Sequence, residues 1–231
     1  MSGLVLSLFP GIGLLDLAFE EEGFCVVRGP DLLWGGDIRT FHPPAGRFDG
    51  VIGGPPCQSF SPIGNVNRAR WGEGSVMPDM IPEFARVVRE ARPAWWIMEN
   101  SPYAHAPDVL SYRMELDGAW LGMAQARRRA FWSNVNLAAH IDVPALVPVG
   151  SGSERTASGL GSVDWKGSRA RESVRTLADL LELQGFNRDM LDGCPLTVAG
   201  AKKAVGNGVP LPVGRAIARA VRAAPEAREA A

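Results

Sequence analysis

Apolar stretches that end in glycine or proline dominate the first hundred residues. Leu4 to Phe9 is strongly apolar, which predicts a strand covered on both faces, as in a parallel sheet. Phe24 to Val27 and Phe48 to Ile52 also predict strands. Leu14 to Glu22 has the apolar spacing of a helix and stops at Gly23, a residue suited to end one. A strand, a glycine loop and a helix in this order are typical of a nucleotide-binding α/β unit.

The middle of the chain predicts one more helix against the sheet. Phe84, Val87, Val88 and Ala91 recur at helical spacing, and Asp79 precedes them as a cap. Pro93 ends this helix. We therefore expect a helix whose apolar stripe packs on the core.

Further strands and helices follow from the same patterns. The pattern predicts strands over Ala94 to Met98, Tyr112 to Leu116 and Ala130 to Leu137, and helices over Thr176 to Leu183 and Ala216 to Ala223.

Two stretches lack such patterns. Ser61 to Met77 is rich in Gly, Asn and Arg, which predicts a long mobile loop, and such loops are uncommon unless they are functional. Arg68 and Arg70 beside Trp71 suit a phosphate backbone, and a solvated basic loop is the alternative. The composition of 150–174 is that of a linker, so we divide the chain into 1–149, 150–174 and 175–231.

Composition narrows the class of protein without identifying it. The 231 residues are 46% hydrophobic, which suits one globular domain with a full core, and the net charge is −1. Bulk charge therefore gives no sign of a nucleic-acid partner. The three cysteines, Cys25, Cys57 and Cys194, favour a reducing compartment over a disulfide framework or a metal site. With no signal peptide or membrane-spanning run in the sequence, we expect a cytoplasmic protein.

The stretch from Gly53 to Phe60 carries the most specific chemistry. Gly-Gly-Pro-Pro follows a predicted strand and forces a turn, because proline fixes φ and lacks an N–H group. Cys57 follows the turn, at the strand end where open α/β sheets keep their ligands. A small buried cysteine is the alternative interpretation, but packing alone does not need so rigid an approach.

Other candidates follow the ends of the remaining strands. Gly11 and Gly13 allow a ligand to approach the backbone. Asp31 can accept hydrogen bonds from ribose hydroxyls, and Asp37 can accept one from an adenine amino group; for both, an ordinary turn or cap aspartate is the alternative. Glu99 shares the strand-end edge with Cys57, unless it is a salt-bridged surface acid.

A run of arginines follows Gln125. Arg127 and Arg129 share one face with Gln125 if this segment is a strand. The alternative for these arginines is a solvated face.

Taken in order, these motifs resemble those of the cytosine-5 DNA methyltransferases. The resemblance covers nearly the whole chain: Phe9-Pro10-Gly11-Ile12-Gly13, Gly54-Pro55-Pro56-Cys57-Gln58, Glu99-Asn100, Gln125-x-Arg127-x-Arg129, Leu183-Gln184-Gly185-Phe186 and Gly206-Asn207-Gly208-Val209-Pro210. It implies a Rossmann-like methyltransferase fold with a mostly parallel sheet and helices on both faces. It also implies S-adenosyl-L-methionine as cofactor and no metal.

The resemblance assigns a role to each candidate. Cys57 would add to carbon 6 of cytosine, and Glu99 would hold ring nitrogen 3 from a buried site with a raised pKa. Arg127 would hold the ring carbonyl and orient Glu99, and Arg129 would support the catalytic loop. The implied cofactor-binding residues are Phe9, Gly11, Ile12, Gly13, Asp31, Asp37, Ile38, Pro55, Asn207 and Val209, and the implied substrate-binding residues are Gln58, Ser59, Asn100 and Gln125.

Departures from the family pattern concern one end of the cofactor site and the recognition of DNA. Ser7 stands where the first motif usually has an acid, and Asp31 stands where the next usually has glutamate. A target-recognition domain is minimal or absent, since fewer than about forty residues separate Leu137 from Thr176. We expect double-stranded DNA as partner, no membrane, and a monomer or weak oligomer with an accessory recognition subunit as an option. The alternatives are the same reaction on RNA, and a non-catalytic cofactor-binding subunit.

Overall fold

A computed structural model describes residues 3–60, 62–141, 154–155, 176–225 and 227. Within these residues the main sheet contains six strands in the order β2-β1-β3-β4-β7-β5. Their bounds are Leu4–Leu8 for β1, Cys25–Arg28 for β2, Gly50–Gly53 for β3, Trp95–Asn100 for β4, Tyr112–Asp117 for β5 and Arg128–Ser133 for β7. A second pairing joins β6, Gln125–Ala126, to β8, Glu154–Arg155.

Strand direction places the candidate residues together. β1, β2, β3 and β4 are parallel, whereas β7 runs antiparallel between β4 and β5. The carboxyl ends of β1, β3 and β4 therefore meet at one edge of the sheet, where parallel sheets bind ligands. This architecture confirms the mostly parallel Rossmann-like fold predicted from the sequence.

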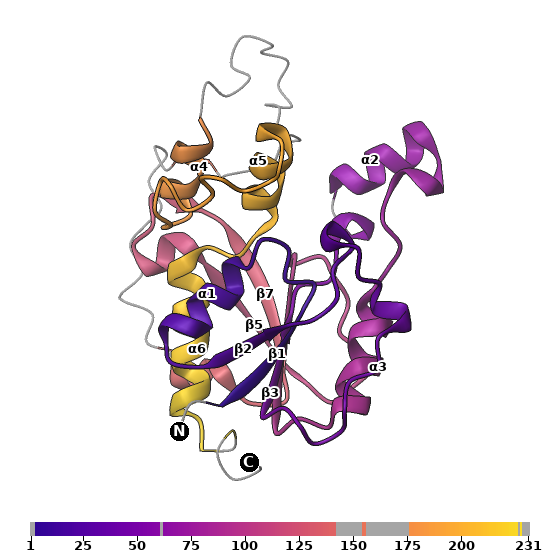
Figure 1. The fold of residues 1–231 in the computed structure, drawn as a ribbon, viewed down its shortest axis with the longest axis vertical. Helices are drawn as coiled ribbons and strands as arrows, with labels where there is room; N and C mark the ends of the chain where they lie inside the picture. Colours follow the sequence, from indigo (N-terminus) through magenta and orange to yellow (C-terminus); the bar gives the residue numbers. More distant parts are fainter. Residues whose placement is uncertain (1–2, 61, 142–153, 156–175, 226, 228–231) are drawn as a thin grey trace.

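Helices cover both faces of the sheet (Figure 1). On one face α1, Leu14–Glu21, and α6, Leu211–Ala223, pack over a core that includes Phe19, Ile97 and Ile217. On the other face α3, Ile81–Ala91, buries Phe84 and Val87 against residues such as Trp96. The remaining helices are α2, Pro62–Trp71, α4, Leu177–Leu183, and α5, Val198–Asn207.

The predicted loop over Ser61 to Met77 is wrong in its described part. Residues 62–71 form α2, which stands away from the sheet, and Glu73–Ser75 forms a 3-10 turn (Figure 1). Arg68 stabilises this arrangement, with Nη1 2.9 Å from Asn65 Oδ1 and Nε 2.8 Å from Glu73 Oε2. These side-chain contacts outweigh a composition that favours loop structure.

The last motif, Gly206 to Pro210, begins inside a helix. Val205 to Asn207 complete α5, and Gly208 is its C-cap. The strand predicted over Ala130 to Leu137 is β7, which begins earlier, at Arg128, and ends at Ser133. A 3-10 turn follows at Leu137–His140. α6 begins at Leu211, five residues before the predicted start. Pro212 is tolerated in its first turn, because an N–H group there has no partner within the helix.

The expected division at 150–174 falls outside the described residues, apart from β8. The predicted cap at Asp79 holds in part, because its carboxylate binds the first turn of α3 while Met80 occupies the N-cap position. Asp79 Oδ1 accepts a hydrogen bond from the Ile81 N–H at 2.9 Å, and Thr176 forms a reciprocal capping box with Asp179 at the start of α4.

A close contact between β3 and β4 yields a stability prediction. A Cβ atom at Gly50 would lie 2.1 Å from Cζ2 of Trp95, a buried ring. We expect Gly50→Ala to lower the free energy of unfolding by about 1–3 kcal/mol, because the packed ring cannot move aside. Urea unfolding measures this change. Gly74→Ala is the matched control, since its Cβ has nothing within 4 Å, and equal stability of the two variants would contradict the expectation.

Candidate active site

The cysteine turn is built as its sequence requires. β3 ends at Gly53, two prolines follow, and Cys57–Ser59 form a 3-10 turn. The Asn100 amide at the end of β4 donates a hydrogen bond to the Pro55 carbonyl at 3.0 Å. The turn is therefore held to the neighbouring strand, and Cys57 remains partly exposed at the carboxyl edge of the sheet.

Glu99 and Arg129 form a buried ion pair beside this turn. Arg129 Nε lies 2.8 Å from Glu99 Oε1, and the carboxylate is almost fully buried. A Cβ atom at Gly54 would lie 3.0 Å from Glu99 Oε2, so the glycine permits the carboxylate to lie against the turn. The expectation of a buried glutamate is confirmed.

Burial and charge set the protonation of this group. Burial raises the pKa of Glu99 above its ordinary value, and Arg129 and Arg127 oppose that shift. Burial also raises the pKa of the Cys57 thiol; the charge of Glu99 adds to this, whereas the two arginines lower it. The neighbours of Cys57 therefore decide how much thiolate is present.

The two arginines differ in their partners. Arg129 pairs with Glu99. The Arg127 side chain is buried, and Nη2 donates to the carbonyls of Gly206 at 2.7 Å and Gly208 at 2.9 Å. Burial, followed by the charge of Arg129, lowers the pKa of Arg127 to about 9, so the guanidinium stays charged at neutral pH. Arg127 joins the last motif to the sheet.

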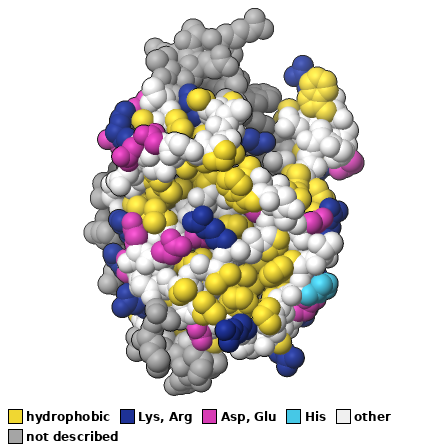
Figure 2. Space-filling model, in the orientation of Figure 1, with side chains coloured by type: hydrophobic (Ala, Val, Ile, Leu, Met, Phe, Trp, Pro, Cys, Tyr) yellow, Lys and Arg dark blue, Asp and Glu magenta, His cyan; other side chains and the backbone are white. Residues whose placement is uncertain are grey.

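A cavity of about 550 Å³ connects the cysteine turn to the glycine loop. Its walls combine apolar side chains with a few charged groups, and hydrophobic side chains gather around a hollow on this face (Figure 2). The predicted site residues that line it are Phe9, Gly11, Ile12, Asp31, Asp37, Ile38, Pro55, Cys57, Gln58, Glu99, Arg129, Asn207 and Val209.

The glycine loop has the backbone that a ligand site needs. Phe9 has φ 56°, an uncommon value for a residue with a side chain, and Gly11 has φ 56° with open space at its Cβ position. Asp31 Oδ2 accepts a hydrogen bond from Gly11 N at 2.8 Å, while Trp34 Nε1 donates to Gly11 O at 2.6 Å. Gly13 does not line the cavity; it caps α1 with φ 80°.

Both aspartates also have the local role named as their alternative. Asp31 and Asp37 are the N-caps of the 3-10 turns Leu32–Trp34 and Ile38–Thr40. Asp37 pairs with Arg39, Nη2 to Oδ2 at 2.6 Å, and hydrogen bonding from Arg39 lowers the pKa of Asp37. Each oxygen of Asp31 accepts one backbone hydrogen bond and keeps a second lone pair for a ligand, whereas both oxygens of Asp37 already accept two donors from Arg39.

A second buried acid lies beneath the glycine loop, and the sequence patterns did not single it out. Asp16 in α1 is fully buried and accepts a hydrogen bond from Ser7 Oγ at 2.5 Å. Arg28 Nε lies 3.0 Å from the other carboxylate oxygen. Burial raises the pKa of Asp16, and Ser7 and Arg28 oppose this shift. Asp16 therefore supplies an acid close to the position where Ser7 replaces one.

Three predicted substrate residues lie elsewhere. The Asn100 side chain donates to the Pro55 carbonyl and accepts from the Ser101 N–H. Gln125 donates to the Leu183 carbonyl at 2.8 Å and to Gln184 Oε1 at 3.0 Å. Ser59 Oγ donates to the Met77 carbonyl at 2.6 Å. None of the three lines the cavity. These three residues hold neighbouring segments from outside the cavity, and their assignment to substrate binding stays a prediction.

Further residues of the cavity wall went unpredicted. They include Lys203 and Gly200 of α5, and Met77 and Met80 before α3. Lys203 lies three residues before the last motif, and this position was the one sequence feature that could have indicated its role. Among the described residues, no cluster of His, Cys, Asp and Glu could hold a metal ion.

The charges around Cys57 predict opposite effects on its reactivity. Glu99→Gln removes the negative charge that raises the thiol pKa, so alkylation of Cys57 by iodoacetamide at pH about 8 should become severalfold faster. Arg129→Gln should make it slower. Peptide mass mapping measures each rate, and exposed Cys25 provides the internal control. Slower alkylation in Glu99→Gln would contradict this account.

Comparisons with known proteins agree with this geometry. Residues 35–110 match the family of C-5 cytosine-specific DNA methylases. The type II methyltransferase M.HgiGI of Herpetosiphon aurantiacus is 32% identical over 116 residues, which are 41% of this chain and 87% of that protein. M.HgiDI of the same organism is 29% identical over 160 residues, 54% of this chain and 50% of that protein. The chain spans half or less of the first curated relatives it matches, with 50%, 32% and 31% covered.

Solved structures support the fold. An E. coli prophage protein described as a DNA modification methyltransferase superposes with a TM-score of 0.62 at 16% identity, over 96% of this chain and 99% of that one. A mutant of Spodoptera frugiperda DNMT2 gives 0.59 at 14% identity, over 93% and 98%. The 32% identity to M.HgiGI over 87% of that protein, together with the family match over residues 35–110, establishes that the chain belongs to the C-5 cytosine-specific DNA methylase family.

Proposed function

We propose that this chain transfers a methyl group from S-adenosyl-L-methionine to carbon 5 of cytosine in double-stranded DNA. One observation carries the proposal: Cys57, Glu99 and Arg129 line the same cavity as the glycine loop. A nucleophile, a buried acid and a fixed cation thus lie beside a slot large enough for a second ligand.

The residues of the cavity suit the methyl donor. Asp31 and Asp37 offer carboxylate oxygens at one end, and Ile38, Leu32 and Val209 offer apolar surface. Open space at Gly11 lets a ligand approach the backbone. The cofactor supplies an electrophilic methyl group on a positively charged sulfur.

Cys57 makes the pyrimidine ring reactive. The thiolate adds to carbon 6 and forms an S–C bond, which turns the ring into an enamine with a nucleophilic carbon 5. After carbon 5 has taken the methyl group, it loses its proton to a base, the S–C bond breaks and Cys57 regains its electron pair. The adduct needs thiolate, so the charges that lower the pKa of Cys57 act in favour of the reaction.

Glu99 and Arg129 hold the ring while charge develops on it. Burial raises the pKa of Glu99, which favours sharing of a proton between its carboxyl and ring nitrogen 3 once the base is bound. Arg129 fixes the orientation of Glu99 and lies in the cavity wall, where its guanidinium can reach the ring carbonyl. Arg127 holds the last motif in register with these groups.

The substrate base must leave the helix to reach Cys57, because carbon 6 is inaccessible inside a duplex. α2 stands away from the sheet (Figure 1), and Gln58 and Met77, which lie on either side of it in the chain, line the cavity. We assign closure over the flipped base to this segment. Recognition of the surrounding sequence would fall to residues 142–175 or to an accessory subunit. No helix of the described residues is long and apolar enough to span a bilayer.

Incubation with labelled methyl donor tests the proposal directly. We expect label on cytosine of duplex DNA and its loss to background in Cys57→Ser, because serine forms no comparable nucleophile at neutral pH. Cys25→Ser is the matched control, since Cys25 is exposed and lies outside the cavity. Label on RNA and not DNA would overturn the substrate class. Unlabelled DNA and RNA with intact protein would favour the cofactor-binding subunit.

Duplex DNA with 5-fluorocytosine tests the covalent step. Fluorine cannot leave as a proton does, so Cys57 should remain bonded to carbon 6 after methyl transfer. We expect a denaturation-resistant complex that maps to the Cys57 peptide and is absent in Cys57→Ser. Methyl transfer without such a complex would contradict the adduct but not the overall activity.

A further inference from the structure

His105 contacts both sides of the segment that separates the cysteine turn from α3. Its Nε2 lies 2.8 Å from Asp79 Oδ2, and its Nδ1 lies 2.7 Å from the Ala106 carbonyl oxygen. The ring meets Phe60 edge to face, with centroids 5.3 Å apart and an angle of 89°. Phe60 follows the cysteine turn, and Asp79 precedes α3. One side chain therefore joins residues nineteen positions apart at the base of α2.

The two polar contacts specify the charge of the ring. Carboxylate and carbonyl oxygens only accept hydrogen bonds, and a neutral imidazole carries a single N–H group. Both contacts are satisfied together only when His105 is doubly protonated. The hydrogen bond to Asp79, followed by that to Ala106, raises the pKa of His105 above its ordinary value. The raised pKa and the two acceptor contacts therefore both favour the doubly protonated ring of His105.

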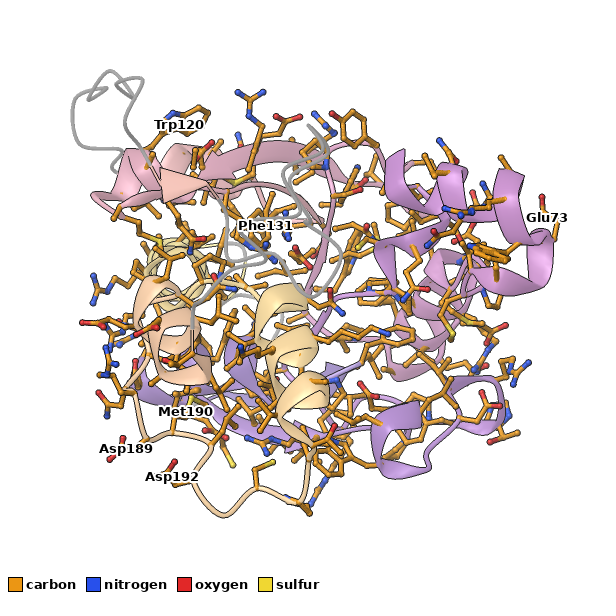
Figure 3. All side chains as sticks on the ribbon, turned by 90° about the horizontal axis from the view of Figure 1, so that it is seen from above. Glu73, Trp120, Phe131, Asp189, Met190 and Asp192 are labelled. Carbon is orange, nitrogen blue, oxygen red and sulfur yellow. The ribbon has the colours of Figure 1, made fainter. Side chains whose placement is uncertain are left out.

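The segment between these contacts is closed at its base, and α2 within it stands away from the sheet (Figure 1). Ser59 Oγ donates to the Met77 carbonyl at 2.6 Å, and the Met77 N–H donates to Gln58 Oε1 at 3.2 Å. Arg68 Nη2 lies 3.4 Å from the Ser59 carbonyl. Seen from above, Glu73 marks the far end of this segment, well away from Phe131 in the sheet (Figure 3). Because Phe60 and Asp79 lie at the two ends of this segment, movement of α2 relative to the sheet requires a change at the residues that His105 contacts.

His105 itself stands on a rigid support. Asn100 ends β4 and its Oδ1 accepts from the Ser101 N–H at 2.8 Å, while the Ala104 N–H donates to the Ser101 carbonyl at 3.1 Å. Ala104 is buried in the core under α3. The same Asn100 holds Pro55 of the cysteine turn. His105 is thus connected through Asn100 and Ser101 to the end of β4, the strand that carries Glu99.

We propose that His105 is a positioning residue that fixes Phe60 and Asp79 to the end of β4, and that its protonation controls how freely the α2 segment moves. The inference deepens the proposed function, because the segment is the one assigned to cover the flipped base. His105 touches no reacting atom and acts through Asp79 and Phe60.

The direction of the pH dependence follows from the contacts. Asp79 is the charged group that faces the ring among the described residues; its other neighbours are the Ala106 carbonyl and the Phe60 ring. A raised pKa in this arrangement means that the contact stabilises the segment below the ordinary histidine pKa and is lost as pH rises through the pKa of the folded state. Deprotonation leaves one oxygen without a donor. The segment should therefore loosen at higher pH.

Amide exchange on the protein without DNA or cofactor tests this inference. Protection factors for residues 64–77, corrected for intrinsic exchange, should fall about tenfold between pH about 6 and about 9, the factor expected for one charge-assisted hydrogen bond. The three histidines can be followed separately by NMR. The midpoint of the fall should coincide with the titration of His105.

Variants separate positioning from general stability. His105→Gln keeps one donor, so its protection should be lower and independent of pH. Asp79→Asn keeps the cap of α3 and should lower the pKa of His105. His42→Gln is the matched control, because His42 also meets a surface carboxylate, Glu90, at 3.0 Å, yet lies outside the site. Wild-type protection without a step, or the same step in His105→Gln, overturns the proposal.

A kinetic measurement adds a second readout. With DNA and methyl donor, His105→Gln should lower kcat severalfold below the step and match the wild type above it, with the KM for the donor unchanged. Equal kcat ratios at all pH values would overturn the coupling to catalysis. Absence of methyl transfer by the wild type would defeat the proposed function and leave the exchange result standing.

Discussion

The buried contact between Glu99 and Arg129 is the constraint on which the site depends. An isolated carboxylate at this depth would be costly, and the guanidinium 2.8 Å away offsets that cost. The pairing follows from topology, because β7 lies antiparallel beside β4 with Phe131 opposite Glu99. Arg129 is two residues from Phe131 and shares its face. Gly54 then becomes necessary, since a side chain there would meet the carboxylate.

Buried polar side chains connect the C-terminal residues to this pair. Arg127 donates to carbonyls at the end of α5, and Gln184 donates to the Val205 carbonyl at 2.7 Å. Gln125 donates in turn to Gln184. Arg127 and Gln125 reach partners 59 to 81 positions away in the chain, and Gln184 reaches Val205 across 21 positions, so the contacts fix α4 and α5 over the cavity. Val209 and Asn207 reach the cavity wall because this network holds them there.

Sequence patterns locate strand ends well and side-chain partners poorly. Cys57 and Glu99 were predictable because each follows an apolar strand that is bound to end at the same edge. Which of Arg127 and Arg129 pairs with Glu99 was not predictable, because alternate residues share a face and periodicity does not say which lies nearer the edge of the sheet. Asn100 and Gln125 were assigned to substrate for a similar reason. A polar residue in a motif looks the same whether it faces a ligand or satisfies buried backbone. α2 was missed because Arg68 stabilises it through Asn65 and Glu73, against the local composition.

Asp16 shows how a departure from a motif can leave the physics of a site intact. Ser7 at the end of β1 has no charge, yet its hydroxyl donates to Asp16, which approaches from α1 and is paired with Arg28 of β2. Three elements thus supply the acid, its donor and its counterion beneath the glycine loop. A Cβ atom at Gly13 would lie 2.4 Å from Arg28 Nη2, so the glycine is needed for this pairing as well as for the turn. The position of a charge in space is therefore a better guide to the site than its position in the motif.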